Sequence, residues 1–289
     1  METTSHLDWL SVTFPVGFQQ EILEAYVGQF KIAGHGNHGY AVRKETRMGV
    51  VLLDDGSRQQ GKNATFSGKA LEQLRDTLGS DAPILRLALA NRGRASRVDL
   101  ALNVYNSTLT PEHFWKALKA GDVITKTAGF KGIDDEGQGM NTLYIGSRKS
   151  DRFMRIYDKA LEQHMDGTAW LRLELQCRRL VARSYVERLG KMDNIRPFVN
   201  RALDEFASFP TLEEYRQAVS EDDAEIPVQG RQLPQFWKWM QSQVIPAMVS
   251  RAIAFPEEEV LLQVTRLFIK QQAERGHNMK PNDPLLDNG

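Results

Sequence analysis

The segment 153–159 places a tyrosine between two cations. Arg155, Tyr157 and Lys159 occupy every second position, with the apolar residues Met154 and Ile156 on either side of Arg155. Because side chains alternate between the two faces of a β-strand, we expect the three polar groups to share one face. A phenol between positive charges is a candidate nucleophile, since those charges favour its ionised form. Guanidinium and ammonium groups also suit a phosphodiester substrate.

Two further segments each place a carboxylate two residues after an arginine. Asp99 follows Arg97, and Glu174 follows Arg172, in both cases with aliphatic residues between them. Carboxylate oxygens are hard ligands that suit Mg²⁺ or Mn²⁺ better than zinc. A metal held by these acids would polarise a phosphate that a tyrosine attacks. The residue types therefore predict phosphoryl transfer through a phosphotyrosine on the polar face of a sheet.

Two alternatives stay open at this level. An antiparallel sheet often exposes one face to water, so the same pattern also fits a solvated surface without a function. A second tyrosine, Tyr144, lies on the polar side of the segment 142–147 and is the alternative nucleophile.

The elements that must position these residues indicate an α+β protein. We expect an antiparallel sheet with one polar active-site face, flanking helices and a helical C-terminal region. Alternating polar and apolar residues predict strands at 8–14, 48–53, 64–66, 97–105, 142–147, 153–159 and 170–177. Helical spacing predicts helices at 18–30, 68–77, 110–120, 181–189, 195–206 and 212–219.

Local signals refine this arrangement. The strands 142–147 and 153–159 are joined by a short polar segment and should form a hairpin. Thr110 is the expected cap of a helix whose first position is Pro111. The Gly-rich segment 129–139 is expected to be mobile. We expect residues 1–210 to form the main domain, and residues 211–289 to form a helical region after or around an acidic linker.

Composition excludes several classes of protein. Apolar residues make up 41% and charged residues 26%, so disorder is not the main state. Lys+Arg and Asp+Glu are both 37, which argues mildly against nucleic acid as a partner, although residues 147–183 are net basic. The single cysteine, Cys177, excludes an intrachain disulfide and a Cys-based zinc cage. No apolar run spans a bilayer and the N-terminus is no secretion signal, so a cytoplasmic location is expected.

The strand motifs resemble a known family, the trans-acting replication initiators of rolling-circle plasmids and the related replication initiation factors of filamentous phages. RVDLALN (97–103) is similar to the family's R-x-D-x-A-x-D strand. Residues 144–159 are similar to its Y-x-G-x-R-x-S hairpin followed by R-x-Y-x-K, and 170–174 to a later W-x-x-E-like strand. The resemblance covers roughly residues 6–210, and the phage branch fits more closely, although a plasmid source stays open.

The resemblance implies a site-specific endonuclease in a bacterial host cell. Such an enzyme nicks one strand at a double-stranded origin, stays joined to the 5′-phosphate through a tyrosine and later religates the DNA. By motif, Tyr157 is the nucleophile and Arg155 and Lys159 are the flanking cations. The family's cofactor is a divalent metal, Mg²⁺ or Mn²⁺.

Two positions depart from the family pattern. The second acid of R-x-D-x-A-x-D is Asn103 here, and Thr65 stands where plasmid members often carry a glutamate. The metal site expected from the resemblance therefore consists of Asp99 and Glu174, with Asn103 as a neutral oxygen ligand.

The expected partners are double-stranded origin DNA and its nicked single strand, but no membrane. Basic residues expected to contact DNA are Arg97, Arg148, Lys149, Arg152 and Arg172. A host helicase, a polymerase and a second copy of the chain in a homodimer stay open as partners. Two other functions remain alternatives: a non-catalytic DNA-binding regulator on the same scaffold, which Asn103 and Thr65 favour, and a conjugative relaxase.

Overall fold

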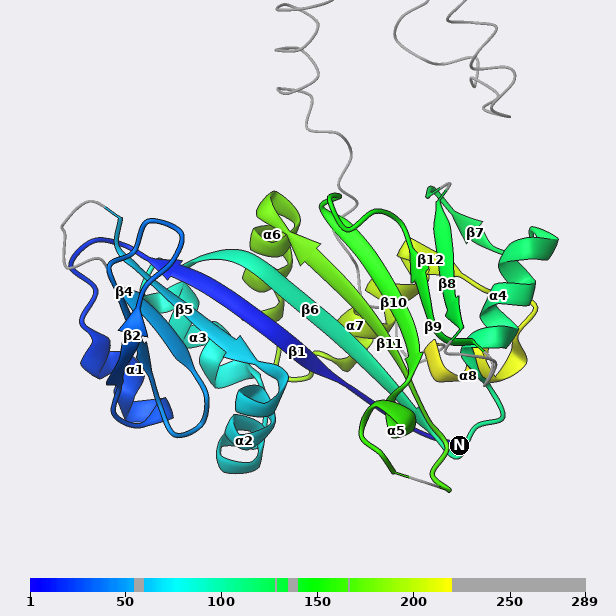
Figure 1. The fold of residues 1–289 in the computed structure, drawn as a ribbon, viewed down its shortest axis with the longest axis horizontal. Helices are drawn as coiled ribbons and strands as arrows, with labels where there is room; N and C mark the ends of the chain where they lie inside the picture. The colour runs from blue at the N-terminus through cyan, green and yellow to red at the C-terminus, as the bar shows by residue number, and fades with distance from the viewer. Residues whose placement is uncertain (55–59, 128, 135–139, 166, 220–289) are drawn as a thin grey trace, which may run out of the picture. The chain divides into compact units, whose positions relative to one another are not determined.

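A ten-stranded antiparallel sheet runs through the computed structural model, which describes residues 1–54, 60–127, 129–134, 140–165 and 167–219. Its strand order is β2-β3-β4-β5-β1-β6-β11-β10-β9-β8 (Figure 1). The two long central strands are β1 (Glu2–Phe14) and β6 (Arg94–Tyr105). Because helices flank this antiparallel sheet, the predicted α+β class is confirmed.

The remaining strands extend the sheet on both sides of this central pair. Beside β1 follow β5 (Lys62–Ser67), β4 (Val51–Asp54), β3 (Val42–Glu45) and β2 (Lys31–His35). Beside β6 follow β11 (Trp170–Arg178), β10 (Arg152–Asp158), β9 (Met140–Ile145) and β8 (Phe130–Asp134). A separate short pair consists of β7 (Ile124–Thr125) and β12 (Ala207–Ser208). The predicted β9–β10 hairpin is confirmed by their antiparallel register.

The helices are α1 (Gln20–Val27), α2 (Gly68–Leu78), α3 (Ala82–Ala90), α4 (Pro111–Ala120), α5 (Lys159–Glu162), α6 (Arg179–Leu189), α7 (Arg196–Phe206) and α8 (Glu213–Val219). The predicted start of α4 is confirmed, with Thr110 at the N-cap and Pro111 in the first turn. The Thr110 backbone N–H donates to His113 Nδ1 at 3.2 Å, so this helix end is closed by its own residues.

The main core lies between the sheet and the helices α6 and α7, which pack on β6 and β11 (Figure 1). Apolar side chains at alternate positions of these strands point into it, among them Leu100, Leu173 and Ile156. Aromatic residues of the two helices, such as Tyr185 and Phe198, close the layer from the other side. Since one face of each strand is used for the core, the opposite face carries the polar residues.

Two predicted details are wrong, and two strands of the sheet were not predicted. Phe130–Asp134, expected to be mobile, forms the edge strand β8 and pairs with β9. Lys159, expected at the end of a strand, begins α5 because the Asp158 carboxylate caps that helix by accepting from the Leu161 N–H at 2.9 Å. The strands β2 and β3 were not expected at all.

The described chain ends within the region expected to form the C-terminal helices. α8 packs on α7 and buries Tyr215, whose hydroxyl donates to the Ala207 carbonyl at 3.0 Å. The expected acidic linker and the helices after it lie outside the described residues, so the domain boundary at residue 210 stays a prediction. Across the described residues, no helix combines the length and the apolar character needed to cross a bilayer.

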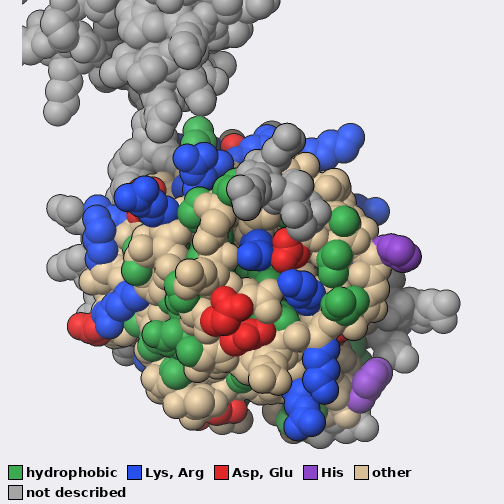
Figure 2. All heavy atoms as spheres, turned by 90° about the vertical axis from the view of Figure 1, so that its left-hand side faces the viewer, with side chains coloured by type: hydrophobic (Ala, Val, Ile, Leu, Met, Phe, Trp, Pro, Cys, Tyr) green, Lys and Arg blue, Asp and Glu red, His purple; other side chains and the backbone are tan. Residues whose placement is uncertain are grey.

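The side of the molecule that carries β2, β4 and α1 does not gather charge of one sign (Figures 1 and 2). Lys and Arg side chains are spread over it among neutral ones, with acidic side chains near its centre (Figure 2). This face therefore carries no single basic patch.

Candidate active site

The strand register brings the predicted residues of four strands onto one face. Arg155 of β10 lies opposite Glu174 of β11, and Asp99 of β6 lies opposite Gln176 of β11. Tyr144 of β9 lies opposite Arg155. Because directly opposed residues share a face, these groups form one polar surface, as the alternating pattern predicts.

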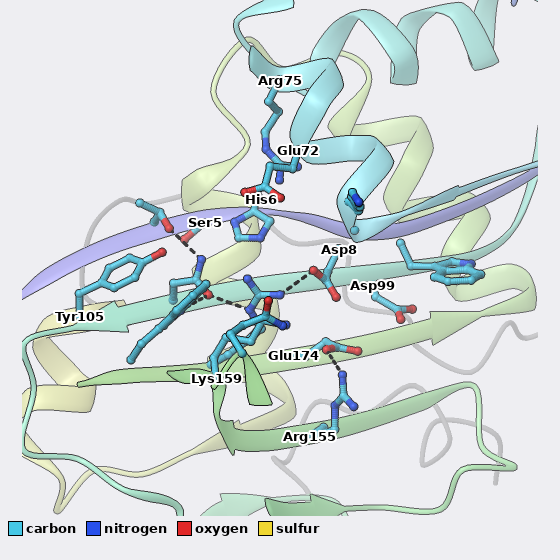
Figure 3. A pocket seen from close by; sticks show the side chains of 18 of the residues that line it. Ser5, His6, Asp8, Glu72, Arg75, Asp99, Tyr105, Arg155, Lys159 and Glu174 are labelled. Carbon is cyan, nitrogen blue, oxygen red and sulfur yellow. Dashed lines mark hydrogen bonds and ion pairs between the residues drawn. The ribbon is translucent and has the colours of Figure 1, made fainter. Parts of the chain in front are cut away.

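This polar surface is the floor of a deep pocket, and it is not a solvated face. Asp99 is 1% exposed and Glu174 is 6% exposed, so both carboxylates are almost removed from water. β1 and α2 supply walls, from which His6, Asp8 and Arg75 reach the pocket (Figure 3). The pocket has a volume of about 940 Å³, which is enough for a nucleotide-sized ligand. A plain solvent-exposed surface therefore does not explain the pattern.

Each buried carboxylate is paired with an arginine. The Asp99 carboxylate accepts from Arg97 Nε at 2.9 Å and from Gln176 Nε2 at 3.3 Å. Glu174 Oε2 accepts from Arg155 Nη2 at 2.6 Å. Burial raises the pKa of both acids, while their arginine partners oppose that rise. The negative charge of Asp99 also raises the pKa of Glu174, which means that the two acids repel each other.

Sequence analysis missed a third acid, Asp8. Counting alternate positions along β1 assigns it to the apolar face, but a β-bulge between Leu7 and Trp9 adds one residue and turns Asp8 into the pocket. Arg172 Nη1 donates to Asp8 Oδ1 at 2.7 Å. Gly68, at the start of α2, lies so close that a Cβ there would be 2.8 Å from the same oxygen. The signal was present in the sequence, because Leu7 and Leu10 break the two-residue period.

Tyr157 is surrounded by the groups that the sequence placed beside it. Its hydroxyl lies 3.3 Å from Arg155 Nη2 and 3.3 Å from Glu174 Oε2, to which it donates. The Arg155 guanidinium lies over the ring at 4.2 Å from its centroid, and Lys159 Nζ lies at 5.7 Å. The phenol is only 3% exposed, so these side chains cover it.

The arginines beside Tyr157 favour its ionised form, as expected, but two other effects outweigh them. The pKa of its phenol is raised above the ordinary value, chiefly by burial and then by the negative charge of Glu174. Arg155 and Arg172 lower it, but by less than the other two effects raise it. Tyr157 is therefore a neutral phenol in this structure, and it needs a proton acceptor before it can attack.

Tyr144, the alternative nucleophile, has different neighbours. Its ring is half-buried and stacks on Phe153, with centroids 5.5 Å apart. The Arg148 guanidinium lies 4.8 Å from the ring centroid. This tyrosine thus sits in an aromatic–arginine stack toward the β9–β10 turn, whereas Tyr157 touches one of the buried acids.

The sequence model of a family described as replication initiation factor matches residues 93–255. This range is more than half of the chain and contains β6, the β9–β10 hairpin and β11. The chain belongs to the replication initiation factor family. All the predicted residues of the pocket lie within the matched range, whereas Asp8 comes from β1 outside it.

One solved structure supports the same fold for this replication initiation factor. A rolling-circle replication initiator protein from Geobacillus stearothermophilus matches with a TM-score of 0.63 and 21% identity, over 72% of this chain and 87% of that chain. A TBP from Methanococcus jannaschii also aligns, over 71% of this chain and 96% of that chain, but with 11% identity and a TM-score of 0.28 it carries no argument. No protein in the curated comparison matches.

Asn103, where the family motif carries an acid, has a positioning contact in place of the expected metal contact. Its Oδ1 accepts from Arg172 Nε at 2.7 Å and from Trp170 Nε1 at 2.9 Å. Its Nδ2 donates to Thr4 Oγ1 at 3.0 Å. These two hydrogen bonds use both lone pairs of the amide oxygen, so Asn103 is not one of the proposed metal ligands.

The five expected DNA-contacting residues lie in different places. Arg152 lies on the opposite, helical side of the sheet, near the Phe206 ring and 4.0 Å from Glu205, because its position has the parity of the apolar face. Arg172 is buried against Asp8 and does not reach the surface. Arg97 lines the pocket, and Arg148 and Lys149 are exposed in the β9–β10 turn.

The family resemblance implies a divalent metal, and the pocket offers carboxylate oxygens that could bind it. The hydrogen bonds of Glu174 use Oε2 and that of Asp8 uses Oδ1, which leaves Glu174 Oε1 and Asp8 Oδ2 without a partner among the described residues. Nowhere in the described ranges do three or more His, Cys, Asp or Glu side chains enclose a metal site. One or two carboxylates with water and substrate phosphate are a common Mg²⁺ environment, so the donors fit.

Proposed function

We propose that this replication initiation factor nicks one strand of origin DNA through Tyr157. The phenol oxygen attacks a phosphodiester, a bond forms between phosphorus and that oxygen, and the bond to the 3′ oxygen breaks. The 5′-phosphate stays on the tyrosine, and the released 3′-OH primes synthesis. Attack of a 3′-OH on the phosphotyrosine reverses these bond changes and religates the strand to end rolling-circle replication.

Glu174 is the proposed proton acceptor for Tyr157. The phenol already donates to its carboxylate at 3.3 Å, so the acceptor lies within reach of the proton. The proton leaves the phenol as the phosphorus–oxygen bond forms, so the tyrosine need not ionise in the resting protein.

Arg155 and Lys159 are proposed to bind the phosphate under attack. Both line the pocket and both cover Tyr157, so an entering phosphodiester would compete for them and uncover the nucleophile. Their positive charge would then stabilise the negative charge that grows on the phosphate oxygens.

Glu174 and Asp8 would hold a bound Mg²⁺ or Mn²⁺ through the oxygens that have no partner among the described residues, and Asp99 lines the same pocket beside them. When bound, the metal supplies Lewis-acid stabilisation of the phosphate. Arg97 and Arg172 would keep the acids in place, since each donates to one of these carboxylates.

The observation that carries the proposal is the contact of the Tyr157 hydroxyl with both Arg155 and Glu174. The test is incubation with supercoiled origin plasmid and Mn²⁺, followed by gel analysis with and without protease. We expect open-circular DNA that carries covalent protein, and we expect Tyr157→Phe to abolish nicking but retain binding.

The same assay separates the alternatives. Nicking that survives in Tyr157→Phe and is lost in Tyr144→Phe would move the nucleophile to β9. DNA binding without any nicking would make the protein a non-catalytic regulator. A conjugative relaxase would also nick DNA through a tyrosine, but it would act on a conjugative transfer origin and not on the replication origin.

A further inference from the structure

A second pocket lies on the same polar face, next to the one that holds the acids. It has a volume of about 600 Å³ and is formed by β1, β4, β5 and the turn after β2. We call it the uncharged groove because of its floor, which consists of Ser11, Thr13, Asn63 and Thr65. Trp9 and Arg97 line both pockets, so the two are continuous at this point.

The chemistry of the uncharged groove differs from that of the first pocket. None of its described lining residues is Asp or Glu, while Arg43 and Arg97 are cationic. The floor is ordered by its own hydrogen bonds, since Ser11 and Thr65 hydroxyls lie 3.3 Å apart and Asn63 Nδ2 donates to Thr13 Oγ1 at 3.0 Å. A groove with hydroxyl, amide and guanidinium groups but no acid suits a phosphodiester chain.

The junction of the two pockets carries a flat stacked pair. The bulge before Trp9 turns its indole onto the polar face, where it is half-buried. The Arg97 guanidinium lies over this ring, 4.6 Å from its centroid. An indole and a guanidinium plane are both surfaces on which nucleobases stack. Stacking requires an exposed base face, and paired bases in a duplex do not offer one.

We propose that the uncharged groove binds the unpaired DNA strand that flanks the cut phosphate, with a base stacked on the Trp9–Arg97 pair. The inference rests on the proposed function in one respect, because it assumes that the bound strand is the strand that the protein nicks. It assigns to Trp9 and Arg97 a part in holding the strand on which the protein acts.

The test uses the full-length protein in the presence of EDTA, so that binding is measured without cleavage. The probes are an end-labelled oligothymidylate and the duplex that it forms with oligodeoxyadenylate, measured by fluorescence anisotropy. Trp9→Ala should weaken binding of the single strand about tenfold or more, because a base–aromatic stack is lost. Trp9→Phe should restore most of the affinity, and duplex binding should change less.

A matched pair of arginines tests the groove itself. Arg43 and Arg86 are both half-exposed, at 46% and 50%, and each has an acidic partner, Glu45 and Asp193. Only Arg43 lines the groove. Arg43→Ala should lower affinity for the single strand, and Arg86→Ala should leave it unchanged.

The outcomes separate this inference from the proposed nicking. Unchanged single-strand affinity in Trp9→Ala, or an equal loss for strand and duplex, would overturn the inference even if the protein nicks origin DNA. Single-strand binding that depends on Trp9 would uphold it even if no nicking is found. Thermal unfolding of Trp9→Ala shows whether a loss reflects misfolding, and Arg43→Ala then decides the case independently.

Discussion

The hydroxyl of Tyr157 donates to the Glu174 carboxylate at 3.3 Å, on adjacent strands of one sheet and almost out of contact with water. Burial, and then the negative charge of Glu174, raise the pKa of the phenol. A neutral phenol beside a buried carboxylate is a nucleophile with its base already in place.

Glu174→Gln should therefore slow nicking by about 10²-fold or more, because the amide cannot accept the phenolic proton. The measurement is the single-turnover rate of nicking, compared with Glu205→Gln. Glu205 is a matched control because it also lies beside an arginine, Arg152, but on the helical side of the sheet. Equal rates in the wild type and Glu174→Gln would exclude Glu174 as the base.

The turn between β9 and β10 should contribute to DNA affinity, while Arg152, the first residue of β10, should not. Replacing both Arg148 and Lys149 by alanine should lower the slope of log affinity against log salt by about 1 for each lost phosphate contact. Arg152→Ala should leave the slope unchanged, since this side chain lies near Phe206 on the other face. A loss of slope in Arg152→Ala alone would contradict the assignment.

Asn103 should matter for stability through Arg172. Asn103→Ala removes the acceptor of a buried guanidinium, so we expect the free energy of unfolding to fall by about 1–3 kcal/mol. Asn103→Asp keeps an acceptor and should lose much less. Urea denaturation measures both, and an alanine variant as stable as the wild type would show that the amide does not hold Arg172.

His6 should make the protein sensitive to acid. Burial, and then the charges of Arg75 and Arg172, lower its pKa from 6.5 to about 2. Between these values the unfolded chain binds a proton that the folded protein excludes, so stability rises with pH in this window and is lost as pH falls below 6.5.

The measurement is urea denaturation of the wild type and His6→Asn at about pH 5 and about pH 7. The wild type should lose more stability on acidification than the variant, by up to about 1.4 kcal/mol for each pH unit. Parallel losses in the two proteins would mean that His6 titrates normally in the folded state.

Much of the polar face could be predicted from the sequence because strand alternation is a local property. The two-residue period and an antiparallel pairing are enough to place Arg155 and Glu174 on the same face, where they lie opposite each other. Likewise, α4 could be placed from Thr110 and Pro111, whose backbone preferences act within one helical turn. Short polar strands such as β2 and β3 carry no clear alternation and were missed.

The rest depended on contacts between distant segments. The bulge that turns Asp8 into the pocket breaks the period from which its face was counted. The rise in the pKa of Tyr157 comes from burial, which the sequence around it does not reveal. His6 and Arg75 reach the pocket only because β1 pairs with β6, which lies between it and β11, and because α2 packs on β1.

The most direct test of the account is the identity of the residue that becomes joined to DNA. The covalent product of nicking is digested with nuclease and protease, and the modified peptide is sequenced by mass spectrometry. The account predicts a phosphodiester-linked nucleotide on Tyr157. A nucleotide on Tyr144 or on any other side chain, or nicked DNA with no attached peptide, would contradict it.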